Sequence, residues 1–265
     1  MIANYHTHTW RCRHADGTER EYVENAIKAG LKILGFSDHT PQVYPDGFVC
    51  RVKMLPSELE GYVNTVLDLK REYKRDIEIL LGLEVEYLYT LWEPLLELLR
   101  PYPIEYMILG QHYLGNGVNV PYCGEPSGSV ERLRQYCRQT REALATGKFL
   151  YFAHPDLLWY TGPGEIYEEE MTKLCRFCKE NDIPLEINLL GVREDRNYPG
   201  EHFWKIAARE GNSVIYGSDA HHADHVYSPE VIAKADRFLL RCGIPRERLI
   251  EVMKDKSQKK DGIVE

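Results

Sequence analysis

Short apolar runs alternate with longer amphipathic segments along the whole chain, and this alternation restricts the fold more than any other feature of the sequence. Most of the runs are rich in β-branched or aromatic residues, as is typical of buried parallel strands. Strands that alternate with helices predict βα units and a parallel sheet. The expected strands are Ile2–Tyr5, Ile33–Ser37, Ile77–Tyr87, Tyr106–Leu109, Phe149–Ala153, Pro184–Asn188 and Ser213–Gly217.

The amphipathic segments between these runs predict the helices. The first helix has a capping box, because Thr18 is followed three residues later by Glu21, and Gly30 suits its C-terminal end. About seven βα units favour a closed or nearly closed barrel, with an open doubly wound sheet as the alternative. Further helices are expected over 56–74, Trp92–Leu99, Ser129–Thr146, Glu165–Asn181, Glu201–Glu210, Pro229–Leu240 and Pro245–Lys254.

The composition is that of a globular protein. The chain has 265 residues, of which 43% are hydrophobic and 28% are charged. This length fits one α/β barrel, so we expect a single domain over residues 1–265. The formal net charge of -8 argues against long nucleic acids as partners, because binding to their backbones requires basic patches.

The sequence gives no sign of export or of membrane insertion. It starts without a basic segment followed by an apolar run, and no stretch reaches the roughly 18 apolar residues of a membrane span. We therefore expect a cytoplasmic protein with no membrane partner, in which the seven cysteines are reduced thiols. The single C-x-x-C pair, Cys175 and Cys178, lies in a helical pattern and is interpreted as core packing.

Histidines and acidic residues follow the predicted strands. Seven of the ten histidines lie at or just beyond strand ends, and carboxylates accompany them. The carboxyl ends of the strands of a parallel barrel meet on one face, which is where the active sites of such barrels lie. Residues that converge there are His6, His8, Asp38, His39, Glu84, Glu86, His112, His154, Glu186, Asn188, Asp219 and His221.

This mixture of side chains predicts a metal centre. Imidazole binds Zn, Fe and Mn, and a carboxylate can bridge two cations. His6 and His8 are two residues apart on an extended strand, so both can reach one metal, and Asp219 and His221 repeat that spacing. Seven histidines with Glu84 and Asp219 are enough ligands for two or three metal ions.

The arrangement resembles the PHP phosphoesterase family (polymerase and histidinol phosphatase) over nearly the whole chain. The motifs that carry the resemblance are H-T-H at 6–8, H-A-D-G-T at 14–18, G-F-S-D-H at 35–39, G-L-E at 82–84, Q-H at 111–112, H-P-D at 154–156 and G-S-D-A-H at 217–221. The spacing looks most similar to that of the stand-alone histidinol phosphatases. The resemblance implies the PHP fold, a distorted (β/α)7 TIM-like barrel.

The resemblance also implies a site with three divalent transition-metal ions, which would be Zn, Fe or Mn. One ion would bind His6, His8, Glu84 and Asp219. A second would share Glu84 and add His112 and His154. The third would bind His14, His39 and His221. Glu84 and Asp219 would thereby act in catalysis, with a hydroxide between the first two ions.

The implied activity is the hydrolysis of L-histidinol phosphate to L-histidinol and phosphate, a step of histidine biosynthesis. Clustered divalent cations would neutralise the ester oxygens and lower the pKa of bound water from about 15.7 towards 7. In-line attack on phosphorus would then release the alkoxide. The alternative is a PHP phosphoesterase for another small phosphate ester or a nucleotide.

Contacts with the substrate are predicted less directly. Arg193 follows the sixth strand, and its guanidinium fork matches two phosphate oxygens, although a surface ion pair with Glu194 or Asp195 explains it equally well. Arg193 is favoured over Arg196. His222 lies beside a predicted ligand and is the candidate general acid. Candidate contacts of the rest of the substrate are Gln111, Tyr113, Glu86, Glu186 and Trp159, whereas Asp38 and Asp156 are expected to orient ligand histidines.

Two positions depart from the family pattern. Gln111 precedes His112 directly, where many relatives have Ser-x-His. The segment D-L-L-W-Y-T-G-P-G after His154 has no basic residue, so any phosphate-binding charge must come from another part of the chain. Two non-enzymatic interpretations remain, a regulatory PHP module and a metal storage or sensor protein, and the sequence does not define the oligomeric state.

Overall fold

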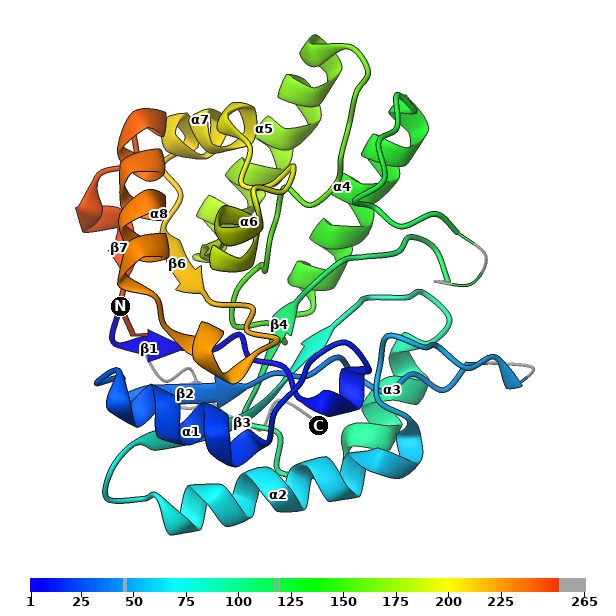
Figure 1. Cartoon of the computed structure of the whole chain (residues 1–265). Coiled ribbons are helices and arrows are strands. Elements are labelled where there is room, and N and C mark those ends of the chain that lie inside the picture. The colour runs from blue at the N-terminus through cyan, green and yellow to red at the C-terminus, as the bar shows by residue number, and fades with distance from the viewer. Residues whose placement is uncertain (45–46, 117, 119, 253–265) are drawn as a thin grey trace.

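A computed structural model describes residues 1–44, 47–116, 118 and 120–252. The expected alternation of strands and helices is present (Figure 1). The strands are β1 (Ala3–Asn4), β2 (Ile33–Phe36), β3 (Glu78–Val85), β4 (Tyr106–Leu109), β5 (Leu185–Asn188), β6 (Val214–Gly217) and β7 (Leu249–Ile250). The helices are α1 (Glu19–Lys28), α2 (Leu59–Glu72), α3 (Trp92–Leu99), α4 (Val130–Ala145), α5 (Gly164–Glu180), α6 (Leu189–Glu194), α7 (Glu201–Glu210) and α8 (Pro229–Cys242).

The strands form a curled parallel sheet in two hydrogen-bonded groups. One group has the order β1-β2-β3-β4 and the other has the order β5-β6-β7, and all pairs are parallel. Phe152 joins the groups through parallel bridges to Leu109 on β4 and Leu185 on β5. On the other side, Thr7 pairs with Ala220, which brings the segments after β1 and β6 together. The predicted parallel α/β architecture is therefore confirmed as a curled half-barrel, while a full count of seven regular βα units is not.

Three expectations differ from the structure. The predicted strand Phe149–Ala153 follows the sheet, since Leu150 N donates to Met107 O at 2.7 Å, but it forms only isolated bridges at Phe152. The helix expected over Pro245–Lys254 is wrong within the described residues, because one 3₁₀ turn leads into β7, and residues 253–254 lie outside the described part of the chain. The short helix α6 was not predicted.

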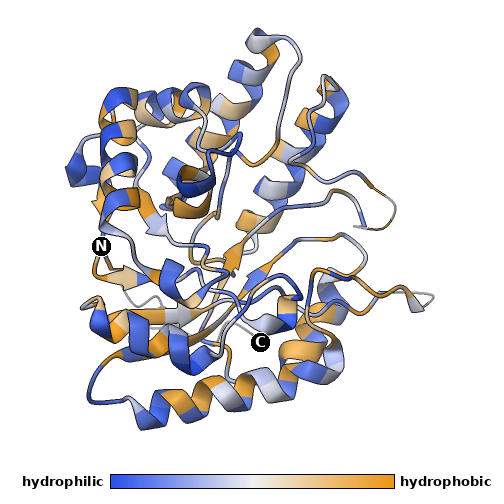
Figure 2. Ribbon diagram, in the orientation of Figure 1, coloured by the Kyte–Doolittle hydropathy of each residue, from blue (hydrophilic) through white to orange (hydrophobic). Residues whose placement is uncertain are grey.

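The longer helices cover the outside of the curled sheet (Figure 1), whereas the short helix α6 lies at its carboxyl edge beside a cavity. Their apolar faces turn inwards and their charged faces turn to solvent, as Figure 2 shows for α2, α4 and α8. The capping box of α1 is confirmed, since Thr18 accepts from Glu21 N and the Glu21 carboxylate accepts from Thr18 N. Gly30 has a left-handed φ of 81° just after the helix, a conformation that costs glycine little.

The large outer core includes the C-x-x-C pair. Cys175 and Cys178 are buried on α5 among apolar side chains, and both are free thiols, so their interpretation as core residues is confirmed. Within the described residues, none of the helices combines the length and the apolar character needed to cross a bilayer.

The concave side of the sheet has a small core of its own, built around Tyr106. The Tyr106 hydroxyl donates to the carbonyl oxygens of Tyr5 at 2.8 Å and Phe36 at 3.1 Å. Its ring passes directly over Gly35 and Gly82, where a Cβ atom would lie 2.2 Å from ring or hydroxyl atoms. Glycine at these two positions therefore lets one tyrosine fill the space beneath the functional face.

We expect Gly82→Ala to lower the free energy of unfolding by about 1–3 kcal/mol, because the new methyl group collides with the Tyr106 ring. Gly61→Ala is the matched control. Gly61 lies inside α2 with open space around its Cα, so alanine there should stabilise the protein by about 0.5–1 kcal/mol. Urea unfolding of both variants measures this, and equal midpoints would contradict the packing described for Tyr106.

Candidate metal centre

The carboxyl edge of the curled sheet gathers the predicted ligands. His6 and His8 follow β1, Glu84 lies near the end of β3, and Asp219 follows β6. Backbone hydrogen bonds hold the first and last of these segments in register, from His8 N to Ala220 O at 3.0 Å and from Ala220 N to His6 O at 3.3 Å. The two ends of the sequence thus meet at one rim, as the strand-end argument predicts.

The first group of side chains consists of His6, His8, Glu84 and Asp219, all of them buried. His6 Nε2 lies 3.6 Å from Glu84 Oε1 and 3.5 Å from Asp219 Oδ1. His8 Nε2 lies 3.7 Å from Glu84 Oε2 and 2.9 Å from Asp219 Oδ1. Four donors of the predicted first ion therefore point into one small volume.

A second group shares Glu84. His154 Nε2 lies 2.8 Å from Glu84 Oε1, and His112 Nε2 lies 3.6 Å from the same oxygen. The two histidine rings are 4.9 Å apart between centroids. The same carboxylate therefore faces donors of both groups, in the position expected of a bridging ligand.

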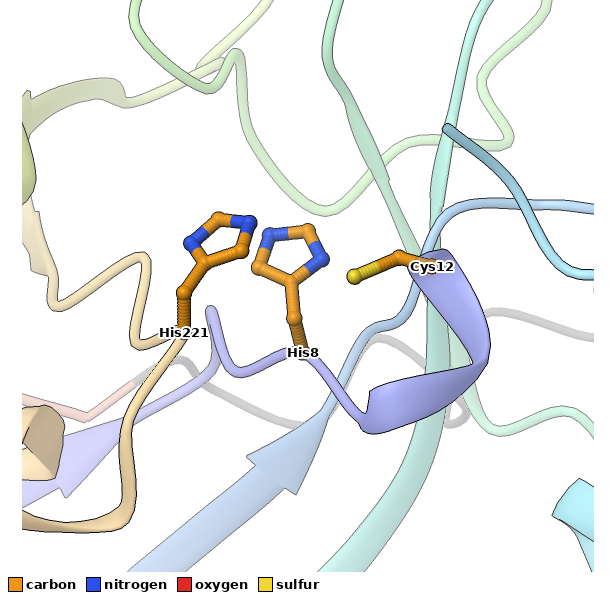
Figure 3. Close-up of side chains that lie close together, drawn as sticks. All are labelled: His8, Cys12 and His221. Carbon is orange, nitrogen blue, oxygen red and sulfur yellow. The ribbon is translucent and has the colours of Figure 1, made fainter. Parts of the chain in front are cut away.

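The third group is made of histidines alone. Ring nitrogens of His14, His39 and His221 lie within 4.8 Å of one another. His221 stacks on His8 with ring centroids 4.1 Å apart, and the Cys12 thiol approaches the opposite side of the His8 ring (Figure 3). His39 Nδ1 lies 2.8 Å from Glu84 Oε2, so the third group borders the other two.

Three spacings in the first group fit a shared metal ion better than direct hydrogen bonds, whereas His8 Nε2 and Asp219 Oδ1 lie at hydrogen-bond distance. Two donors about 2.1 Å from a tetrahedral ion lie about 3.4 Å apart, close to the 3.5–3.7 Å spacings of the first group. Those spacings are too long for strong hydrogen bonds. His6 Nε2 and His221 Nε2 are buried without any hydrogen-bond partner, which is costly unless a ligand satisfies them.

Neighbouring oxygens hold the other nitrogen of several rings. His6 Nδ1 lies 2.8 Å from Glu186 Oε2, and His112 Nδ1 lies 3.1 Å from Glu86 Oε1. His14 Nδ1 lies 2.8 Å from the carbonyl oxygen of Cys12. Partners of this kind are typical of metal-binding histidines, because they fix the ring and leave Nε2 for the ion.

These contacts correct the expectation that Glu186 lines a substrate wall, whereas Glu86 does reach the wall of the cavity described below but is engaged by neighbouring side chains. Glu186 is fully buried against His6, and Glu86 is buried between His112 and Lys53. The expected orienting role of Asp38 agrees with the structure, since it accepts from His39 N at 2.8 Å and lies 3.5 Å from His8 Nδ1. Asp156 instead accepts from Gly200 N at 2.7 Å.

The rim attracts positive charge, either protons or metal ions. Burial lowers the pKa of His6, His8 and His112, but the neighbouring carboxylates outweigh it and raise all three pKa values, that of His8 to about 9, so a metal ion has to displace protons from these rings.

Burial would raise the pKa of Glu84 and Asp219, but the surrounding histidines hold both pKa values well below the ordinary range of a carboxyl group. Burial lowers the pKa of His39 and His221 well below the usual value of histidine. Ionised carboxylates and neutral imidazoles are the forms that bind metals.

A cavity of about 430 Å³ opens over the third group and Asp219. Three predicted substrate or proton contacts, Glu86, Tyr113 and His222, lie in its wall. His222 is half exposed, and its Nδ1 is 2.7 Å from an oxygen of Asp16. The wall also contains residues that strand-end reasoning missed or disfavoured, which are Val52, Lys53, Tyr122, Leu190, Glu194, Arg196 and Tyr198.

Three other predicted contacts lie elsewhere. Arg193 is not part of the cavity wall and donates from its guanidinium to the carbonyl oxygen of His225 at 3.3 Å. Gln111 is fully buried, and its amide bonds to the backbone of Tyr87 and Tyr113, so it shapes the loops and does not reach the cavity. Trp159 is exposed outside the cavity wall.

Lys53 was not predicted because it lies in an irregular segment with no periodic pattern. Its ammonium forms a buried ion pair with Glu86, which leaves the other oxygen of Glu86 for His112. A buried charge is costly unless it is paired. The lysine therefore keeps Glu86 ionised at the place where it orients a predicted ligand.

We expect Lys53→Met to destabilise the protein by about 3–5 kcal/mol, because it leaves the Glu86 carboxylate buried without a cation. Adding Glu86→Gln should recover more than half of the loss, since the amide is neutral and its oxygen still accepts from His112. Urea unfolding of the two single variants and the double variant measures the coupling. Additive losses would contradict the pairing.

Comparisons with known proteins place the chain in a family. The model of the PHP domain family matches residues 4–189. A Bacillus subtilis protein named histidinol-phosphatase is 27% identical over an alignment that covers 89% of this chain and 98% of that protein. A Deinococcus radiodurans protein named "Probable histidinol-phosphatase" is 28% identical over 236 residues, covering 85% of this chain and 88% of that protein.

Solved structures show the same fold. The Lactococcus lactis histidinol phosphate phosphatase, crystallised with zinc, L-histidinol and phosphate, aligns with a TM-score of 0.70 and 20% identity over 92% of this chain and 94% of that chain. A structure from Listeria monocytogenes aligns with a TM-score of 0.71 and 19% identity over 87% of this chain and 99% of that chain. With a family match that spans most of its length, the chain belongs to the PHP domain family.

Proposed function

We propose that this protein is a metal-dependent phosphomonoesterase that hydrolyses L-histidinol phosphate to L-histidinol and phosphate. The observation that carries the proposal is the convergence of three donor groups on the buried carboxylate of Glu84. The relatives named as histidinol-phosphatases, which align over 85% and 89% of the chain, support the choice of substrate.

The proposed site holds three divalent ions. His6, His8, Glu84 and Asp219 would hold the first, Glu84, His112 and His154 the second, and His14, His39 and His221 the third. When bound, divalent cations neutralise phosphate oxygens and lower the pKa of water, which supplies a nucleophile near neutral pH. Zn, Fe and Mn all suit imidazole and carboxylate donors.

The residues of the chain would orient the ligands and move the proton. Glu186 and Glu86 fix the rings of His6 and His112, so the donors need little rearrangement when an ester binds. His222 is the proposed general acid for the leaving alkoxide. Asp16 holds its Nδ1, which leaves the other ring nitrogen free to donate to the departing oxygen.

The organic part of the substrate would lie in the cavity beside the metal ligands. Tyr113 and Tyr122 line it with rings 5.8 Å apart, and Tyr122 stacks near His112 at 6.3 Å. An imidazole group can stack against such aromatic walls. A cavity of about 430 Å³ also has room for other small phosphate esters, so hydrolysis of a different small ester is the alternative function.

The test is phosphate release by protein stripped with a chelator and then reloaded with Mn, Fe or Zn. Reloaded protein should turn over L-histidinol phosphate faster than nucleotides, sugar phosphates and a phosphodiester, and the stripped protein should be inactive. A preference for another monoester would retain the phosphatase and reject the proposed substrate. Hydrolysis of none of these esters would reject the enzyme.

Asp219→Asn and His154→Ala should each lower kcat by about 100-fold or more, because even partners of metal ligands contribute 10- to 100-fold. The fold should survive, which circular dichroism and thermal unfolding check. His202→Ala is the control. His202 lies on the exposed surface of α7 and pairs with Glu168 of α5, so this variant should retain full turnover. Near-native kcat in either ligand variant would contradict the proposed site.

A further inference from the structure

A phosphate group in the cavity requires a positively charged side chain to bind it in addition to the metal ions. The segment after His154 has no basic residue. Among the described residues, Lys53 and Arg196 are the lysine and arginine side chains in the cavity wall. Lys53 is neutralised by its buried pair with Glu86, which leaves Arg196 as the cation available to a ligand.

The end of α6 places Arg196 in the wall. Asn188 caps the start of this helix by accepting from Gly191 N at 2.9 Å, and it also donates to Asp219 at 3.0 Å. Asp195 then adopts a left-handed conformation with φ 54°, which ends the helix, and Arg196 N donates back to Gly191 O at 3.1 Å. The turn therefore ties the position of Arg196 to a proposed metal ligand.

The guanidinium of Arg196 already holds an anion. Its Nε and one terminal nitrogen approach the same oxygen of Glu194, at 2.8 and 2.6 Å. Its other terminal nitrogen donates to the hydroxyl of Tyr198 at 2.9 Å. Two adjacent N–H groups are thus occupied by a carboxylate in the manner that suits the oxygens of a phosphate group.

The pair between Glu194 and Arg196 is weak enough to exchange. Side-chain exposures are 45% for Glu194 and 39% for Arg196, and exposed ion pairs contribute only about 0–1 kcal/mol. A phosphate dianion carries more charge than a carboxylate and offers more acceptor oxygens. It can therefore displace Glu194 from the guanidinium while Tyr198 continues to hold the opposite side.

Tyr198, whose hydroxyl accepts from Arg196, connects this arginine to the donors of the proposed second ion. The ring of Tyr198 is 5.8 Å from that of His154, and the ring of Tyr122 is 6.3 Å from that of His112. Burial raises the pKa of Tyr122, the charge of Arg196 opposes this rise, and Asp219 adds to it. Tyr122 thus lies within the field of both the guanidinium and the metal-binding carboxylates.

We propose that Arg196 is the phosphate-binding cation of the cavity, and that Glu194 occupies its guanidinium until a phosphate dianion replaces it. The inference rests on the proposed function in one respect only, that the ligand contains a phosphate group. Glu194 then competes with phosphate for the guanidinium and weakens phosphate binding. In the absence of phosphate, the same carboxylate holds the Arg196 side chain in position.

The test is the binding of inorganic phosphate to metal-loaded, full-length protein, measured by calorimetry. Arg196→Gln should raise Kd about tenfold or more, because it removes hydrogen bonds between charged groups. Glu194→Gln should lower Kd up to about fivefold, because the competing carboxylate is gone. The charge-matched controls Arg209→Gln and Glu201→Gln lie on exposed α7 and should leave Kd within about twofold.

The double variant separates exchange from plain repulsion. If Glu194 competes for the guanidinium, Glu194→Gln should have little effect once Arg196 is glutamine. An equal effect in both backgrounds would overturn the exchange, and an unchanged Kd for Arg196→Gln would overturn the role of Arg196. Lack of measurable phosphate binding by the wild-type protein would overturn both. Because the probe is phosphate alone, a different preferred ester would reject the proposed substrate and leave this inference intact.

Discussion

The site depends on one buried carboxylate, that of Glu84. Its side chain is almost completely buried, and donors from several elements surround it, including His39 at 2.8 Å and His154 at 2.8 Å. An isolated carboxylate in such a place would be expensive to desolvate. Its stability requires either protonated histidines or bound cations. His6 and His112 suit the second solution, because each is held through Nδ1 and turns Nε2 towards Glu84.

The backbone makes room for this carboxylate as specifically as the side chains do. Gly110 follows β4, and a Cβ atom there would lie 1.9 Å from Glu84 Oε1. Gly217 at the end of β6 plays the same part for Glu186, where a Cβ would lie 2.2 Å from Oε2. Both glycines lie at strand ends next to carboxylates of the rim. Because any side chain at these positions would collide with the carboxylates, the polar cluster requires glycine there.

Most of the nine proposed metal ligands lie at strand ends, so the strand pattern predicted that they meet at one rim, whereas His14 follows a 3₁₀ turn and was assigned through the family resemblance. The strand pattern predicts where each segment of the chain reaches the rim, and histidines and carboxylates occur at those positions. The same reasoning failed where the chain is irregular. Arg193 was favoured over Arg196 because it is nearer to the strand, but α6 intervenes and its left-handed end at Asp195 directs the later arginine to the cavity.

Other misses have the same physical origin. Lys53 reaches the cavity from an irregular loop, and a hydrophobic pattern does not encode such a path. Gln111 directly precedes a ligand, yet its amide is consumed by backbone groups of Tyr87 and Tyr113. The terminal helix was expected from an amphipathic pattern, but Leu249 pairs with Val214 at the edge of the sheet, so a tertiary contact overrides the local preference.

The distribution of charge around the rim follows from these contacts. Glu86 and Glu186 are engaged with histidines, and Lys53 is engaged with Glu86, so none of the three charges is free for a ligand. Among the lysine, arginine and carboxylate side chains that the described residues contribute to the cavity wall, the exposed ones are Glu194 and Arg196. The buried charges of Glu86, Glu186 and Lys53 thus hold the metal-binding histidines in place. The exposed pair of Glu194 and Arg196 can exchange partners when a substrate binds, and this exchange leaves the buried pairs unchanged.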